Sequence, residues 1–271
     1  MLEALSYDFM QNALMASILL SICAGIIGSL IVVNRMVFLA GGIAHTSYGG
    51  IGMAIYFGIP IFLGASVFAV GAAILIAMIS LKQKGRIDTF IGLIWAVGMA
   101  IGVIFVDLTP GYNVDLMSYL FGSILAIGRE DLYFIVALLV VILASISLWY
   151  REILAVSYDS EYAALRGVHV KFFYTLILIL SALTVVVAIK IVGLILVIAL
   201  LTIPVYMAEK LSSTLAGMMF ISSALSLLFT TVGLFLSYSY NLTSGATIIL
   251  VAAAFLLVFS AIRYFLSPNL S

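Results

Sequence analysis

Long apolar runs recur along the whole chain, and they constrain its fold more than any other feature. A helix of about 20 apolar residues spans the hydrocarbon core of a bilayer. Nine runs of spanning length are recognisable: 12–33, 37–57, 60–80, 89–107, 132–149, 172–189, 191–208, 214–236 and 244–263. Backbone polar groups in lipid must be satisfied within the segment, so continuous runs predict helices. We therefore predict an all-α polytopic membrane protein, with about eight or nine transmembrane helices in a single domain over 1–271.

The composition excludes a water-soluble chain and several functions. Hydrophobic residues make up 66% and charged residues 8%, whereas a soluble domain carries about 25% charged residues. The net charge is zero and no block of like charges is present, so we expect a lipid bilayer and no nucleic acid as partner. No GxxxxGK[ST] phosphate-binding pattern occurs, and we expect a chain that is not itself an enzyme.

The distribution of Lys and Arg predicts the orientation. With the N-terminus outside and nine crossings, nine of the eleven cations fall on the cytoplasmic side, and only Arg129 and Lys190 fall outside. This is the positive-inside pattern, and it predicts a cytoplasmic C-terminus. A tenth crossing at 111–128 would place the basic loops 82–86 and 151–171 on opposite sides. We therefore interpret 111–128 as a re-entrant or outer short helix.

The second apolar run contains a histidine, His45, surrounded by glycines. Gly41, Gly49 and Gly52 share its helical face, since they lie four before, four after and seven after it. Gly98 and Gly102 form a GxxxG in the fourth run, so we predict all five glycines to be helix-packing residues. An ionisable group within a span indicates a functional site near His45. The alternative is a neutral histidine that holds helices together by a hydrogen bond.

A short helix is predicted near 157–168, between two spans on the cytoplasmic side. Ser157 or Asp159 could cap it, Glu161 lies in its first turn, and Gly167 follows its end. A short helix held between two spans suits docking on a cytoplasmic partner. The alternative is a linker helix that lies on the membrane surface.

Several stretches together resemble the permease subunits of bacterial ABC importers for zinc, manganese and iron, the metal-specific ABC-3 family. They are FLAGGIAHTSYGGIGMA at 38–54, DTFIGLIWAVGMAIG at 88–102, VDLMSYLFGSILAI at 114–127, DSEYAALRGV at 159–168 and, more weakly, VGLILVIALLTIP at 192–204. His45 falls on the histidine of the family, and Asp115 falls on its aspartate. Glu161 and Gly167 fall on matching positions of the segment that couples the permease to its ATPase.

The resemblance implies a homodimer in the bacterial inner membrane, with cytoplasmic ABC ATPase subunits and an extracytoplasmic metal-binding protein. It implies no permanently bound cofactor. The cargo would be a divalent metal ion, with zinc first and manganese or iron as alternatives. His45 and Asp115 would contact this metal, and imidazole suits such ions. Asp159, Glu161 and Gly167 would couple the chain to the ATPase.

The sequence departs from the family pattern beside the histidine. Gly42 stands where relatives commonly have an aspartate, and Gly49 with Gly50 replaces a prolyl-glycine. The role of Asp115 stays open, because it could instead cap a short helix. The alternative function is a stand-alone secondary transporter or channel for a cation, which should carry charged residues within several spans.

Overall fold

The computed structural model describes residues 7–80, 87–110, 121–194 and 196–266, and within these ranges every regular element is a helix. Eight of the helices have 20 residues or more. They are α1 (Asp8–Val33), α2 (Val37–Phe57), α3 (Ile61–Ser80), α4 (Ile87–Asp107), α6 (Arg129–Tyr158), α8 (Val170–Val192), α10 (Leu215–Tyr240) and α11 (Ser244–Leu266). The shorter elements are η2 (Ile124–Ala126), α7 (Ser160–Leu165) and α9 (Val197–Glu209).

The prediction of an all-α polytopic membrane protein is confirmed. Seven helices in the described ranges are long and apolar enough to cross a membrane. The remaining long helix, α2, has 21 residues but is less apolar, because it carries His45, Thr46 and Ser47 among its glycines.

The run 191–208 does not form the continuous spanning helix that we predicted. Its first residues complete α8, which ends where Gly193 adopts a left-handed φ of 90°. The helix that follows, α9, has 13 residues and measures about 20 Å at 1.5 Å per residue. A bilayer core is about 30 Å thick, so α9 alone is shorter than a full span. The segment from Gly193 to Glu209 still connects the end that holds Lys190 and Asp131 with the cavity that Glu209 lines near α7. A glycine in a conformation that breaks the helix therefore divides this apolar run.

The two connections that flank α6 also differ in detail from the expectation. α6 continues past the predicted end at 149 to Tyr158, although the backbone at Trp149 is not helical (φ −126°, ψ 28°). Of the predicted outer element at 111–128, residues 111–120 lie outside the described ranges. Its described part contains the single turn η2 and returns to α6 at Gly128.

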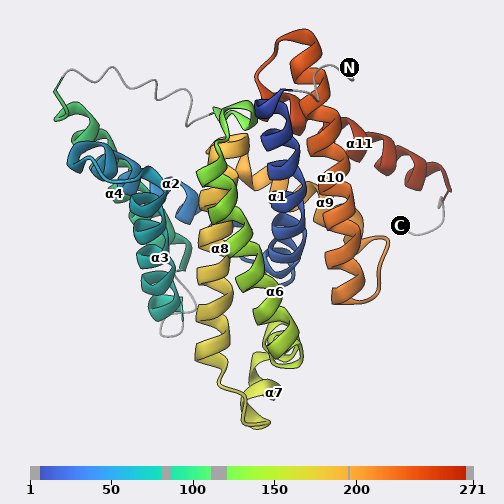
Figure 1. The fold of residues 1–271 in the computed structure, drawn as a ribbon. Coiled ribbons are helices and arrows are strands. Elements are labelled where there is room, and N and C mark those ends of the chain that lie inside the picture. The colour runs from blue at the N-terminus through green and yellow to red at the C-terminus, as the bar shows by residue number, and fades with distance from the viewer. Residues whose placement is uncertain (1–6, 81–86, 111–120, 195, 267–271) are drawn as a thin grey trace.

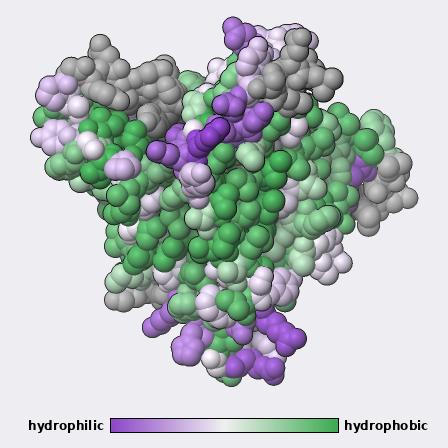
Figure 2. Space-filling model, viewed as in Figure 1, coloured by the Kyte–Doolittle hydropathy of each residue, from purple (hydrophilic) through white to green (hydrophobic). Residues whose placement is uncertain are grey.

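The helices fall into three neighbouring groups (Figure 1). α2, α3 and α4 pack on one another at one side, α1, α6 and α8 form the centre, and α9, α10 and α11 lie at the other side. α7 lies at one end of the molecule, and the start of α1 lies at the opposite end. Hydrophilic residues gather at these two ends, and a broad hydrophobic belt lies between them (Figure 2). This distribution is that of a chain with its belt in lipid.

Small and hydroxylated residues hold α1 against α10. The Ser222 hydroxyl lies 3.2 Å from that of Ser29 and donates to the carbonyl of Gly25 at 2.9 Å. Deeper in the bundle, the hydroxyls of Ser21 and Thr230 lie 3.1 Å apart. Small residues let two helix backbones approach closely, and hydroxyls then bond across them. α2 and α4, which pack on each other outside this α1–α10 contact, form the candidate site.

Candidate functional site

His45 lies near the middle of α2, with its ring stacked on Trp95 of α4. The ring centroids are 4.0 Å apart and the ring planes differ by 15°. The Nδ1 atom of His45 is buried and has no hydrogen-bond partner among the described residues. Most buried polar atoms are paired, and an unpaired one calls for an explanation. A ring nitrogen with a free lone pair can bind a metal ion or a proton.

Trp95 is held in place by the neighbouring side chains. Its indole Nε1–H points to the sulfur of Met99, 3.1 Å away and one turn further along α4. The ring of Phe38 lies 6.4 Å from it. Sequence reasoning did not identify Trp95 as the partner of His45. The available signal was the spacing of Trp95, Gly98 and Gly102, which places all three on one helical face.

Glycines set the close approach of α2 to α4. A Cβ atom at Gly49 would lie 2.7 Å from the carbonyl oxygen of Gly98, and one at Gly52 would clash with the carbonyl of Gly102. Side chains at these positions would push the helices apart, and the stack of His45 on the indole ring requires them close. Gly41 differs from Gly49 and Gly52, because a Cβ there would meet Ile198 of α9, 2.8 Å away.

Gly42, where the resemblance leads one to expect a carboxylate, has no room for one. A Cβ atom at this position would collide with Cγ2 of Ile91 on α4. Ile91 is 2% exposed, and its β-branched side chain has little freedom to move aside. This chain therefore differs from the family pattern both in the residue at position 42 and in the side chain of Ile91 packed against it.

The second predicted metal residue, Asp115, lies outside the described residues. In the part of the chain that the structure describes, no group of three or more His, Cys, Asp and Glu side chains could hold a metal ion. The indole of Trp95 stacks on His45, and the thioether of Met99 contacts that indole.

The predicted coupling segment forms α7 and its caps. Asp159 is the N-cap, and its Oδ1 accepts the N–H groups of Glu161 at 3.1 Å and Tyr162 at 2.8 Å. Gly167 follows the helix with a left-handed φ of 79°. The helix has an outward face, since Leu165 is 87% exposed. Of the two candidate caps, the structure uses the carboxylate of Asp159, and Ser157 has another partner.

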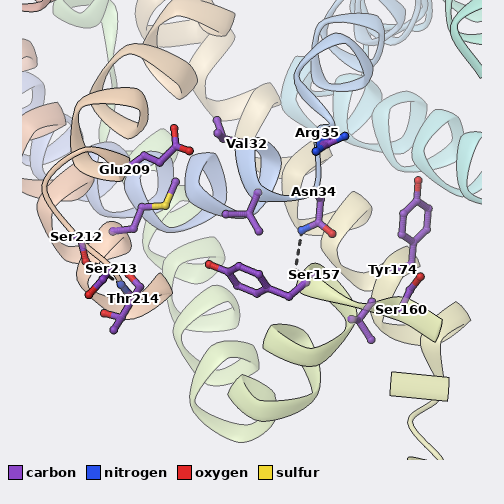
Figure 3. A pocket seen from close by; sticks show the side chains of 14 residues that line it. Val32, Asn34, Arg35, Ser157, Ser160, Tyr174, Glu209, Ser212, Ser213 and Thr214 are labelled. Carbon is purple, nitrogen blue, oxygen red and sulfur yellow. Dashed lines mark hydrogen bonds between the residues drawn. The ribbon is translucent and has the colours of Figure 1, made fainter. Parts of the chain in front are cut away.

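A polar cavity of about 640 Å³ lies beside α7 (Figure 3). Its walls come from the corner between α1 and α2, the junction of α6 with α7, and the loop between α9 and α10. The Asn34 amide donates to the Ser157 hydroxyl at 2.9 Å across this cavity. Arg35 and Glu209 supply its charges. The hydrogen bond ties the corner that leads into α2 to the start of α7.

The apolar belt and the helix count define an integral membrane protein, and comparison with known proteins identifies its family. The model of the ABC 3 transport family matches residues 6–263. The chain belongs to this family.

Individual relatives match over nearly their whole length. An uncharacterised membrane protein of Synechocystis sp. is 48% identical over 263 residues, which cover 97% of this chain and 94% of that protein. The manganese import system permease protein ScaB of Streptococcus parasanguinis is 35% identical, with 97% and 92% covered. The solved structure of PsaBC from Streptococcus pneumoniae in complex with Fab superposes with a TM-score of 0.86 at 32% identity, over 95% of this chain and 93% of that chain.

Proposed function

We propose that this chain is the permease subunit of an ABC importer that carries a divalent transition-metal ion into the cytoplasm. The family and the metal-transport relatives support this role. The observation that carries it is the histidine stacked on Trp95 between α2 and α4, whose buried Nδ1 has no hydrogen-bond partner among the described residues. Such a group, inside an apolar belt, offers a moving cation one weak ligand. A cargo must leave again, so a site with few ligands suits transport.

The proposed orientation puts α7 in the cytoplasm. The end that carries α7 also carries Arg35 and, beside Glu209, Lys210, with Arg166 and Lys171 on either side of the turn after α7. Arg129 and Lys190 lie at the opposite end. Cytoplasmic loops carry the excess of cations in membrane proteins. α7 and the adjoining cavity would then face the ATPase subunits, and the other end would face the extracytoplasmic metal-binding protein. The same reasoning places the N-terminus outside and the C-terminus inside, in the inner membrane.

The proposed assembly is a homodimer with two ATPase subunits. Glu161 in the first turn of α7, and Leu165 on its outward face, would dock on the ATPase. Gly167 follows the helix with a positive φ of 79°, and its N–H donates to the carbonyl of Ala164 at 3.0 Å. Its role would be to turn the chain back into α8.

Zinc stays the first candidate cargo, with manganese or iron as alternatives. Imidazole and thioether ligands suit zinc better than manganese, which prefers carboxylates. Gly42 removes a carboxylate where relatives commonly have one, and the sulfur of Met99 accepts the indole N–H of Trp95, which stacks on His45. Relatives named for manganese transport favour the alternative. Uptake measurements therefore have to decide between zinc and manganese as the cargo.

The test is uptake of zinc, manganese and iron by the complex, with His45→Ala compared with His169→Ala. His169 is the other histidine of the chain and is exposed ahead of α8. We expect His45→Ala to lower uptake of the cargo metal by about tenfold or more, as for loss of a metal contact, and His169→Ala to leave it unchanged. Equal uptake of every metal by both variants would reduce His45 to a packing residue.

A further inference from the structure

A half-buried ion pair lies at the end of the molecule opposite α7. Nζ of Lys190, in the last turn of α8, is 2.6 Å from Oδ2 of Asp131, in the first turn of α6. The Asp131 side chain is 12% exposed and that of Lys190 is 34% exposed. The other ion pair among the described residues, Arg129 with Asp8, spans 3.8 Å, and its side chains are 76% and 81% exposed. Only the first pair is shielded from water.

The pair also holds a third helix. Nζ of Lys190 lies 4.9 Å from the ring centroid of Phe62, at the start of α3. That ring stacks on Phe134 of α6, with a centroid distance of 4.9 Å. Cations are attracted to the face of an aromatic ring. Lys190 thus joins the group that contains α2, α3 and α4 to the central helices α6 and α8.

The segment before α6 is fastened to the same pair. The backbone N–H of Gly128 donates to Oδ2 of Asp131 at 2.9 Å, and the N–H of Ser123 donates to the carbonyl of Lys190 at 3.2 Å. Four separate contacts therefore converge on two residues. Separating α3 from α6 and α8 at this end would break the contact to Phe62 and expose the ion pair.

A small apolar cavity lies directly inward of these contacts. It has a volume of about 60 Å³ and is lined by residues of α2, α3 and α8, among them Ile51, Phe62 and Lys190. Ile51 follows His45 by six residues, which is about 9 Å along the helix axis. Ile51 is buried, and it shares this cavity with Phe62 and Lys190, which lie toward the end of the molecule opposite α7.

We propose that Lys190, Asp131 and Phe62 form an outer latch, which keeps α3 closed on α6 and α8, and that the contact of Lys190 with Phe62 must part before the outer side has access to Ile51 in α2. The proposal rests on the orientation given under the proposed function. The ion pair to Asp131 holds the ammonium group of Lys190 close to the Phe62 ring, and opening α3 would remove this cation–ring contact and the stack of Phe62 on Phe134. The latch thus favours the closed arrangement seen here, and another force must open it.

Cysteine accessibility tests the latch without metal or ATP. Cys23 is fully buried, so Ile51→Cys in a Cys23→Ser background provides a single reporter behind the latch. Right-side-out vesicles that contain the full complex are treated with a membrane-impermeant thiol reagent. We expect Lys190→Met to raise the labelling rate about tenfold, because it removes the cation–ring contact that holds Phe62 of α3 and leaves Asp131 unpaired beside it.

Two matched variants distinguish a latch from general damage. Lys190→Arg keeps the charge and should keep the low labelling rate. Arg129→Gln removes a cation at the same end but breaks only the exposed pair, so labelling should change by less than about twofold. Unchanged labelling in Lys190→Met would overturn the latch, and so would an equal rise in Arg129→Gln. Metal uptake by the unmodified complex tests the proposed function separately, so the two proposals can fail independently.

Discussion

At the scale of single residues, the site is defined by how His45 and Gly42 meet α4. His45 has an aromatic partner in Trp95 and a ring nitrogen with no partner among the described residues. Gly42, one turn earlier, is in contact with Ile91. No carboxylate is present at position 42, and the side chain of Ile91 fills the space that one would need. A substitution that introduces a carboxylate at position 42 therefore has to be combined with a smaller residue at position 91.

We expect Gly42→Asp alone to destabilise the protein, because its Cβ collides with Ile91. Overpacking of this kind costs about 1–3 kcal/mol. Combining it with Ile91→Ala should remove the collision and place a carboxylate three residues before His45, although loss of the buried Ile91 side chain itself lowers stability. Because manganese prefers oxygen ligands, the double variant should transport more manganese relative to zinc than the unmodified protein. Thermal unfolding in detergent and competitive uptake measure the two effects, and an unchanged metal ratio would contradict the assigned role of position 42.

At the scale of helices, the pair α2 and α4 depends on contact between backbones. We expect Gly98→Ala to destabilise the protein by about 1–3 kcal/mol, because its Cβ would lie 2.7 Å from Cα of Thr46. Gly92 on the same helix is the control, since a Cβ there meets nothing within 4 Å. Gly92→Ala should be neutral or slightly stabilising. Equal melting temperatures of the two variants would contradict the close packing of α2 on α4.

A separate prediction at this scale concerns α7 and its proposed docking on the ATPase. Replacing Glu161 or Gly167 by Ala should abolish ATP-driven uptake while the permease stays folded and inserted in the membrane. Glu130→Ala is the matched control, because Glu130 is an exposed acid in the first turn of α6 at the opposite end. Uptake and membrane insertion are measured for all three. Normal uptake in both α7 variants would remove the docking role.

Much of the helical pattern could be predicted from the sequence, because apolar runs follow directly from the demands of lipid. The short helix after Asp159 was also predictable, since a capping carboxylate and a following glycine are local signals. The division of 191–208 was harder, because Gly193 lies in an uninterrupted apolar run. Its effect depends on the left-handed conformation that it adopts in the fold.

The partners of the site residues could not be predicted in this way. Sequence analysis selected His45 but not Trp95, since the stack depends on the register between two helices. Lys190 was recognised only as a cation on the outer side, and its pairing with Asp131 joins residues 59 positions apart. Pairings between helices are set by tertiary packing, which one sequence without relatives does not reveal.

At the scale of the whole molecule, the two ends carry different connections between the same helix groups. At one end, the hydrogen bond from Asn34 to Ser157 ties the corner before α2 to the start of α7. At the other end, Lys190 joins α3 to α6 and α8. His45 lies on α2 between the two ends. An import cycle that opens alternately to each side would have to loosen these connections in turn, with ATP supplying the energy.

The most direct test of this account is metal uptake into proteoliposomes that contain the permease, its ATPase and its metal-binding protein. Radioactive zinc, manganese and iron are supplied in turn, with ATP, with a non-hydrolysable analogue, and without the ATPase subunit. We expect one metal to accumulate only when the ATPase and hydrolysable ATP are both present. Accumulation of a cation by the permease alone, driven by an ion gradient, would contradict the account and identify a stand-alone transporter or channel.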